Sequence, residues 1–281
     1  LSIRRQRQMC IRDSGSYKEM VNDKGLNLDV VYIATPVKYH YEHVKLCLEA
    51  GLNVLCEKPI TSTLEQFKEL VTIAHNNGCF FMEGMWMKCL PSFQKACQWI
   101  REDRIGEVEL IKADLYKREL IREKYAIYNA DEGGGVLHDF GVYAIAFMEC
   151  FIGGLPDKIN AMCRTSSHGV DSDWQISAER EGRKAFVNLS SNFGSLSKAA
   201  VIGNNGFIEW NSQFNRTCCV TLYNASGNQT EKYSTSYTYE GFEYEVNEVH
   251  KCIRNGLKES PIITLNGTYN TMQIIDCLCK S

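Results

Sequence analysis

The sequence predicts an α/β protein, in which an incomplete, doubly wound parallel sheet domain is followed by an α+β domain with an open, mostly antiparallel sheet. In the first part of the chain, apolar strands alternate with helices of about a dozen residues, the pattern of parallel strands joined by crossover helices. From Val108 onward, strands of alternating polarity follow one another through turns such as Asn205-Gly206, mostly without helices between them.

The first regular elements are a short helix and a buried strand. Ser16–Asn22 is predicted to be helical, with Ser16 as N-cap and Glu19 at the spacing of a capping box. Asp29–Thr35 is nearly continuous in apolar and β-branched residues, which is typical of a parallel strand covered on both faces. Pro36 ends this strand.

Two more strand and helix pairs follow along the chain. Helical spacing predicts helices over Tyr39–Ala50 and Ser62–Asn76, and short apolar runs predict strands over Asn53–Cys56 and Cys79–Met82. The order strand, helix, strand, helix, strand predicts a doubly wound sheet, in which ligands bind at the carboxyl ends of the strands.

The second part of the chain contains the alternating strands and three helices. Gly133–Phe151 begins with glycines and continues as a strongly apolar helix, which we expect to be buried between the two domains. Phe242–Asn255 and Gly267–Cys279 predict terminal amphipathic helices. The strands are predicted over Val108–Tyr116, Lys158–Arg164, Trp174–Glu179, Ala185–Ser191, Phe207–Trp210 and Cys219–Tyr223.

Charge and cysteine usage exclude several classes of partner. The 281 residues carry 31 Lys and Arg against 34 Asp and Glu, a net charge of −3, so we expect no nucleic-acid partner. No stretch approaches the roughly 20 apolar residues of a membrane helix, so we expect no membrane partner. The 13 cysteines form no C-x-x-C pair and favour a reducing cytoplasm. His40 and His43 lie i, i+3 without a third ligand at suitable spacing, so no metal site is expected.

Three residues are candidates for chemistry by their position and type. Lys58 follows the predicted strand Asn53–Cys56, at the edge where ligands bind, and position alone leaves a solvated loop lysine equally open. Asp139 and Tyr143 lie four apart on the predicted interdomain helix and share a face. A nearby ammonium could lower the pKa of a tyrosine toward the working range, which makes Lys58 and Tyr143 a candidate proton-handling pair. The alternatives are a structural tyrosine hydroxyl and an interdomain salt bridge of Asp139.

Five motifs in one order carry a family resemblance. They are ATP at Ala34–Pro36 with His40 four residues later, EKP at Glu57–Pro59, MEGMW at Met82–Trp86, IGEV at Ile105–Val108 and GGGVLHDFGVY at Gly133–Tyr143. Over about residues 15 to 281, the chain resembles the glucose–fructose oxidoreductase / inositol dehydrogenase / MocA (Gfo/Idh/MocA) family. The D-x-G-x-Y ending is most similar to the dihydrodiol dehydrogenase and xylose dehydrogenase branch.

The resemblance implies an enzyme that transfers a hydride between NADP or NAD and the carbinol or carbonyl carbon of a small-molecule sugar or cyclic diol. It implies Lys58, Tyr143 and Asp139 as catalytic residues, with a Lys58-Pro59 peptide bond that is often cis in relatives. The cofactor-binding residues that it implies are Ala34, Thr35, Pro36, His40, Glu57, Lys58 and Trp86.

The resemblance also implies a partial dinucleotide-binding (Rossmann) domain over residues 15–104 and a C-terminal substrate and oligomerisation domain over residues 105–281. Relatives commonly pair through the C-terminal sheet, so a homodimer is expected. The outer face of this sheet is predicted to carry some of the apolar residues Ile159, Ile176, Val187, Leu189, Val201, Val220 and Leu222.

The beginning of the chain departs from the family pattern. Residues 1–14 are rich in arginine and predict a non-native or disordered arm. No G-x-G-x-x-G turn occurs, so the chain is expected to lack at least one βαβ unit of ~30 residues and to bind NAD(P)H weakly or not at all. The alternative function is therefore a catalytically inactive fragment that retains a structural, oligomerising sheet.

Overall fold

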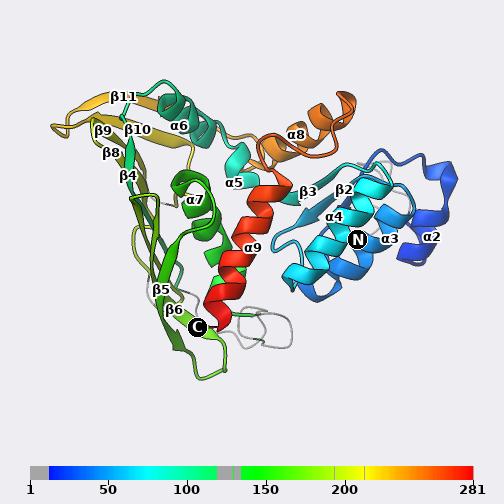
Figure 1. Ribbon diagram of the computed structural model, residues 1–281. Helices are drawn as coiled ribbons and strands as arrows, with labels where there is room; N and C mark the ends of the chain where they lie inside the picture. The colour runs from blue at the N-terminus through cyan, green and yellow to red at the C-terminus, as the bar shows by residue number, and fades with distance from the viewer. Residues whose placement is uncertain (1–12, 119–128, 130–133, 193, 212, 281) are drawn as a thin grey trace.

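The computed structural model describes residues 13–118, 129, 134–192, 194–211 and 213–280. Within these residues the strands form two sheets, one of three strands in the order β1-β2-β3 and one of eight in the order β11-β10-β9-β8-β4-β7-β6-β5 (Figure 1). In the same residues no helix has the length and the apolar character that crossing a bilayer requires. Most of the predicted arm and Gly133 lie outside the described residues.

The small sheet is parallel, as the sequence predicts. Its strands are β1 (Val31–Ile33), β2 (Val54–Glu57) and β3 (Phe81–Gly84), and each pairs in parallel with the next. Helix α2 begins at the predicted cap, since Ser16 Oγ accepts a hydrogen bond from the Glu19 backbone N–H at 3.2 Å. The helical segments of this part are α2 (Tyr17–Asn22), α3 (His40–Glu49), α4 (Leu64–Asn76) and the 3₁₀ turns Lys24–Leu26 and Val37–Tyr39.

The large sheet is mixed and mostly antiparallel. Strand β4 (Val108–Tyr116) pairs in parallel with β7 and antiparallel with β8, and every other neighbouring pair in the described part of this sheet is antiparallel. Strands β8 and β11 were not predicted. The remaining strands are β5 (Lys158–Thr165), β6 (Asp171–Arg180), β7 (Arg183–Ser190), β8 (Ala199–Gly203), β9 (Gly206–Trp210), β10 (Cys219–Asn224) and β11 (Gln229–Ser234).

The helices of the second part lie on the side of the large sheet that faces the small sheet (Figure 1). They are α5 (Trp86–Cys89), α6 (Pro91–Arg101), a π-helical turn at Leu137–Gly141 that leads into α7 (Val142–Ile152), α8 (Phe242–Arg254) and α9 (Leu265–Lys280). Helix α6 was not predicted. Helix α7 packs directly on β4 and β7, and α9 lies between α7 and the small sheet (Figure 1). The predicted burial of α7 is confirmed, because the sheet covers one side of its apolar surface and α9 another, while Tyr143 in its first turn faces Lys58 beside the small sheet.

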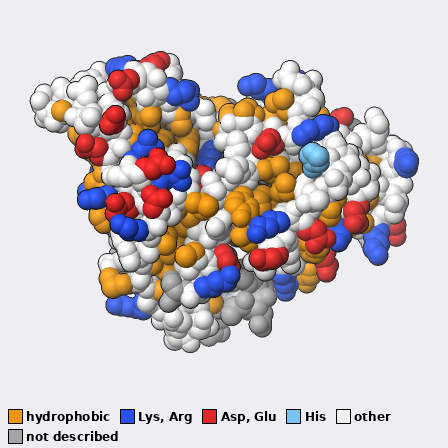
Figure 2. Space-filling view, viewed as in Figure 1, with side chains coloured by type: hydrophobic (Ala, Val, Ile, Leu, Met, Phe, Trp, Pro, Cys, Tyr) orange, Lys and Arg blue, Asp and Glu red, His pale blue; other side chains and the backbone are white. Residues whose placement is uncertain are grey.

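Helix α9 joins the two hydrophobic cores. Its Met272 belongs to the core of the small sheet, whereas Ile274, Ile275 and Leu278 belong to the core of the large sheet. Hydrophobic side chains gather in the middle of the face shown in Figure 2, where α9 contacts α4. The position of one sheet relative to the other therefore depends on α9.

The predicted outer face of the large sheet is wrong. Six of the seven apolar residues assigned to it are at most 3% exposed and belong to the core beneath the helices: Ile176, Val187, Leu189, Val201, Val220 and Leu222. Ile159 is half-buried and packs against the same core. Alternation identifies residues that share a face, but the most apolar face is the one that the helices cover. The open face instead carries residues such as Phe186 and Met162.

Candidate active site

The turn that carries Lys58 lies at the carboxyl ends of β1 and β2. The Lys58-Pro59 peptide bond is cis, as the resemblance implies. Buried His40 contacts the main chain with both ring nitrogens, since Nδ1 lies 2.9 Å from the Pro59 carbonyl oxygen and Nε2 lies 2.7 Å from that of Thr35. The imidazole thereby ties the ends of the two strands together.

The three residues proposed for catalysis converge although 81 positions separate Lys58 from Asp139. The Lys58 ammonium donates a hydrogen bond to the Asp139 backbone carbonyl, lies 3.6 Å from Asp139 Oδ1, and sits over the Tyr143 ring at 5.4 Å from its centroid. The ammonium thus faces the aromatic ring. The exposed fraction of the Lys58 side chain is 16% and that of Asp139 is 39%, so a small molecule can reach both.

The Tyr143 hydroxyl is held by Trp86. The indole Nε1–H donates a hydrogen bond to the Tyr143 oxygen at 2.8 Å, and the Trp86 ring stacks on Phe242 at 4.7 Å between centroids. Burial raises the pKa of Tyr143 well above its usual range, and the Trp86 hydrogen bond opposes this rise. The expected lowering of this pKa by Lys58 is therefore wrong for the protein alone, because desolvation of the phenolate outweighs it.

A widened turn and one carboxylate position Asp139. Asp139 lies within the π-helical turn Leu137–Gly141, and Asp171 Oδ2 accepts hydrogen bonds from the Leu137 backbone N–H at 2.8 Å and from Trp174 Nε1 at 2.6 Å. A Cβ at Gly141 would lie 2.9 Å from the Val136 carbonyl oxygen and 2.7 Å from a methyl group of Leu189. The glycine of the D-x-G-x-Y motif thus permits the close approach of this turn to the sheet.

After burial, the negative charges of Glu57, Glu245 and Asp139 also raise the pKa of Tyr143. Glu57 accepts hydrogen bonds from the Tyr32 hydroxyl and, through Oε2, from the Lys58 backbone N–H at 3.1 Å. Glu245, on α8, is 2% exposed, and its Oε2 has no hydrogen-bond partner among the described residues. Burial raises the pKa of Glu245 to about 8, with a further contribution from Glu57. Sequence reasoning missed Glu245, although a carboxylate on the apolar stripe of an amphipathic helix, three residues after Phe242, was the available signal.

The arrangement fits the nicotinamide end of a dinucleotide. The buried Glu245 carboxyl can donate or accept a hydrogen bond, the Glu57 carboxylate accepts from amide and hydroxyl donors, and the Lys58 ammonium donates to an alcohol oxygen. A cavity of about 360 Å³ next to them is mostly apolar, with walls that include Val30 and Leu55. Within the described residues, no cluster of three or more His, Cys, Asp or Glu could hold a metal ion.

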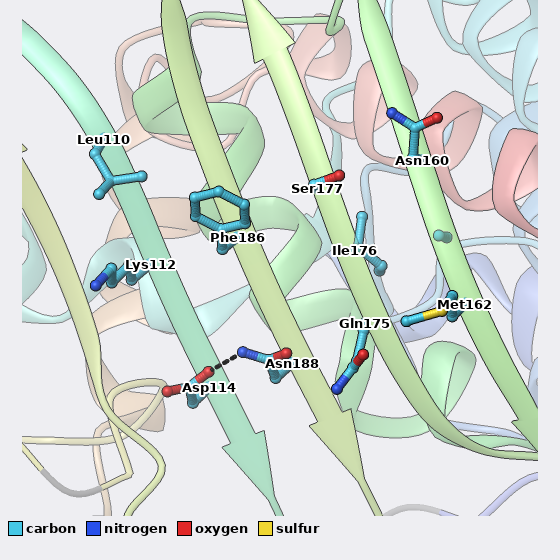
Figure 3. A pocket seen from close by; sticks show the side chains of 11 residues that line it. Leu110, Lys112, Asp114, Asn160, Met162, Gln175, Ile176, Ser177, Phe186 and Asn188 are labelled. Carbon is cyan, nitrogen blue, oxygen red and sulfur yellow. Dashed lines mark hydrogen bonds between the residues drawn. The ribbon is translucent and has the colours of Figure 1, made fainter.

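The open face of the large sheet forms a second hollow, of about 710 Å³, outside this site. Figure 3 shows its side chains, among them Lys112, Asp114 and Asn188, projecting from neighbouring strands. Asn188 Nδ2 donates a hydrogen bond to Asp114 Oδ1 at 2.7 Å. Phe186 and Met162 are 45% and 68% exposed, so the face combines polar groups with exposed apolar ones.

Comparison with known proteins gives matches along most of the chain. Residues 5–85 match the model of the GFO_IDH_MocA oxidoreductase family, NAD-binding Rossmann fold, and residues 93–209 match the GFO/IDH/MocA C-terminal domain. Trans-1,2-dihydrobenzene-1,2-diol dehydrogenase of Macaca fascicularis is 32% identical over 260 residues, covering 89% of this chain and 76% of that protein. The enzyme of the same name from Xenopus tropicalis is 28% identical over 272 residues, covering 93% and 80%.

Solved structures share the fold. Aldose-aldose oxidoreductase from Caulobacter crescentus, complexed with glycerol, superposes with a TM-score of 0.87 at 18% identity, covering 99% of this chain and 85% of that one. Levoglucosan dehydrogenase in complex with NADH and levoglucosan superposes with a TM-score of 0.86 at 19% identity, covering 99% and 84%. The α/β architecture predicted from the sequence is confirmed.

Proposed function

Because this chain belongs to the Gfo/Idh/MocA family of NAD-binding oxidoreductases, we propose that it transfers a hydride between NADP or NAD and the carbinol or carbonyl carbon of a sugar or cyclic diol. The convergence of Lys58, Asp139 and Tyr143 at the edge of the parallel sheet carries this proposal. Relatives named as dihydrodiol dehydrogenases support a diol, and structural neighbours named for aldose and levoglucosan support a sugar.

The proposed chemistry divides among three side chains. Oxidation of an alcohol releases the hydroxyl proton as the carbonyl forms, and Tyr143 Oη takes that proton, whereas in carbonyl reduction it supplies one. Lys58 donates a hydrogen bond to the substrate oxygen and stabilises the phenolate form of Tyr143. Asp139 orients the ammonium, which lies 3.6 Å from its carboxylate. The raised pKa of Tyr143 keeps its proton in place at neutral pH, which suits carbonyl reduction.

A bound nicotinamide would supply the hydride acceptor or donor. We assign its contacts to Glu57 and Lys58 and to the end of β1 at Ala34, Thr35 and Pro36. His40 and Trp86 shape this cofactor site indirectly. His40 holds the Thr35 and Pro59 carbonyls, and Trp86 holds the Tyr143 hydroxyl.

The proposal is tested by turnover and by cofactor binding measured separately. Reduced-nicotinamide absorbance with NAD and NADP, over a panel of trans-diols and aldoses, should report activity that Tyr143→Phe lowers by about 10²-fold. Fluorescence titration with NADH and NADPH should give similar affinities for the variant and the unaltered protein, and micromolar affinities would contradict the weak binding expected from a sequence without a G-x-G-x-x-G turn. Tyr223→Phe is the matched control, because Tyr223 stacks on Phe207 in the large sheet, away from Lys58. Full activity of Tyr143→Phe would remove this hydroxyl from the mechanism.

We propose in addition that the protein is a homodimer through the open face of the large sheet. The exposed Phe186 and Met162 and the hollow that they help to line support this surface. Sedimentation at micromolar concentration should give a dimer, and Phe186→Glu should shift it toward monomer. A monomeric unaltered protein would contradict the proposal.

A cytoplasmic location completes the proposal. All twelve cysteines in the described part of the chain are free thiols, which is the state that a reducing compartment maintains. Cell fractionation would test it, and recovery in a secreted fraction would contradict it.

A further inference from the structure

A buried carboxylate lies directly behind the Lys58 turn. Glu83 is the third residue of β3, is 3% exposed, and stands in the otherwise apolar run Cys79–Met85. Its Oε1 accepts a hydrogen bond from the Ile60 backbone N–H at 3.2 Å, and its Oε2 accepts one from Thr268 Oγ1 at 3.2 Å. Glu83 therefore connects the turn after β2 with helix α9.

This carboxylate belongs to a buried polar cluster that spans both units. Lys88 on α5 lies 3.5 Å from Glu149 Oε2 on α7, and Asn270 on α9 donates a hydrogen bond to Glu149 Oε1 at 3.0 Å. The positive charge of Lys88 is also the main influence that favours the ionised form of Glu83. Buried charges are costly unless they are paired, and an apolar residue in β3 would avoid this cost.

The contacts of Glu83 have a specific geometrical consequence. The Lys58–Ile60 turn is held at three main-chain points: Glu57 accepts from the Lys58 N–H, His40 contacts the Pro59 carbonyl, and Glu83 accepts from the Ile60 N–H. Glu83 differs from the other two side chains in that it also accepts a hydrogen bond from Thr268 on α9. Since α9 packs on α7, which carries Tyr143, Glu83 connects the two halves of the candidate site.

We propose that Glu83 is a positioning residue, which sets the place of Lys58 relative to Tyr143 by fixing the Ile60 main chain against α9. This inference rests on the proposed roles of Lys58 and Tyr143. Either ionisation state of the carboxyl can do this, because a protonated Oε2 donates to the Thr268 oxygen while Oε1 still accepts from Ile60. An amide has the same capacity, so glutamine should replace glutamate here, whereas leucine should not.

The first readout does not need turnover. Hydrogen–deuterium exchange of a peptide covering residues 59–63 reports the Ile60 amide. In Glu83→Leu this amide should exchange about tenfold faster or more, because it has lost its acceptor, whereas in Glu83→Gln it should exchange at the rate of the unaltered protein. Equal exchange in Glu83→Leu and the unaltered protein would overturn the inference.

The second readout is the division between kcat and KM. Glu83→Leu should lower kcat about tenfold or more with little change in KM, and Glu83→Gln should restore it. Ser260→Ala is the control for a general loss of stability, since fully buried Ser260 likewise donates to a carboxylate, at 2.6 Å from Glu248 Oε1. It should lower Tm without slowing turnover. Unchanged kcat in Glu83→Leu, or a loss in Glu83→Gln equal to that in Glu83→Leu, would contradict the positioning role.

A second variant covers the case in which Glu83→Leu does not fold. Thr268→Val removes the hydrogen bond to α9 without changing the shape of the side chain, and it should lower kcat several-fold. Unchanged kcat would contradict the connection to α9. Full activity of Lys58→Met would instead show that the proposed function is wrong, whereas the exchange experiment would still decide whether Glu83 holds Ile60.

Discussion

Removal of the Lys58 charge should disable the proton-handling tyrosine. In Lys58→Met the side chain keeps its approximate length and apolar stem but loses the ammonium that lies 5.4 Å from the Tyr143 ring centroid. Tyr143 is buried, and burial has already raised its pKa. Without the ammonium, the phenolate that must accept the substrate proton in alcohol oxidation loses the positive charge that faces its ring.

The size of this effect follows from the distance. With the phenolate charge placed at the ring centroid, 5.4 Å from the Lys58 ammonium, two unit charges interact by about 3 kcal/mol at an effective dielectric constant of about 20. Since one pKa unit corresponds to about 1.4 kcal/mol, the variant should raise the pKa of Tyr143 by about two further units. At neutral pH the phenolate that accepts the substrate proton would then be populated about 10²-fold less. The kcat for alcohol oxidation should therefore fall by about the same factor.

The matched control uses a second lysine–tyrosine pair of the same geometry. Lys68 on α4 lies 5.5 Å from the Tyr269 ring centroid on α9. Steady-state kcat from reduced-nicotinamide absorbance should fall in Lys58→Met and remain unchanged in Lys68→Met. Equal turnover of Lys58→Met and the unaltered protein would refute the reasoning.

Three further predictions concern the surroundings of the site. Trp86→Phe keeps an aromatic ring against Phe242 but removes the hydrogen bond to Tyr143, so kcat should fall about fivefold with KM nearly constant. The pKa of Glu83 rises from 4.5 to about 7 on burial, so the native state binds more protons between these values, and stability falls as pH rises through them. Urea unfolding of Glu83→Gln should lack this dependence of about 3 kcal/mol. Gly141→Ala places a methyl group 2.9 Å from a backbone oxygen, so overpacking should lower the free energy of unfolding by about 2 kcal/mol, and calorimetry should show a lower Tm.

Strands and helices with a strong apolar pattern could be predicted from the sequence, whereas polar or very short ones could not. Strand β4 has the predicted bounds, because its alternation runs over the whole of Val108–Tyr116. Strand β11 (Gln229–Ser234) is a polar edge strand, and its order comes from pairing with β10 rather than from its own pattern. Helix α6 did carry a signal, with Pro91 at its first turn and Phe93, Ala96 and Ile100 at helical spacing.

Which face of the large sheet is buried could be learned only from the tertiary structure. Alternation groups Val187 with Leu189 and places Phe186 opposite, but it does not state which group the helices cover. In the candidate site, too, some contacts could be predicted from the sequence and others could not. Sequence motifs predicted the meeting of Lys58 with Tyr143, whereas the hold of Glu83 on Ile60 depends on contacts between β3 and the turn after β2. A glutamate within an apolar strand was the one sign of it.

Transfer of deuterium to the nicotinamide tests the central claim most directly. A trans-diol or aldose deuterated at the carbinol carbon is incubated with the protein and NAD or NADP, and the reduced cofactor is examined by mass spectrometry. The unaltered protein should place the label in the reduced nicotinamide, and Tyr143→Phe should do so about 10²-fold more slowly. Absence of label with both cofactors across the panel, or transfer by Tyr143→Phe at the unaltered rate, would contradict a hydride-transfer site built from Lys58, Asp139 and Tyr143.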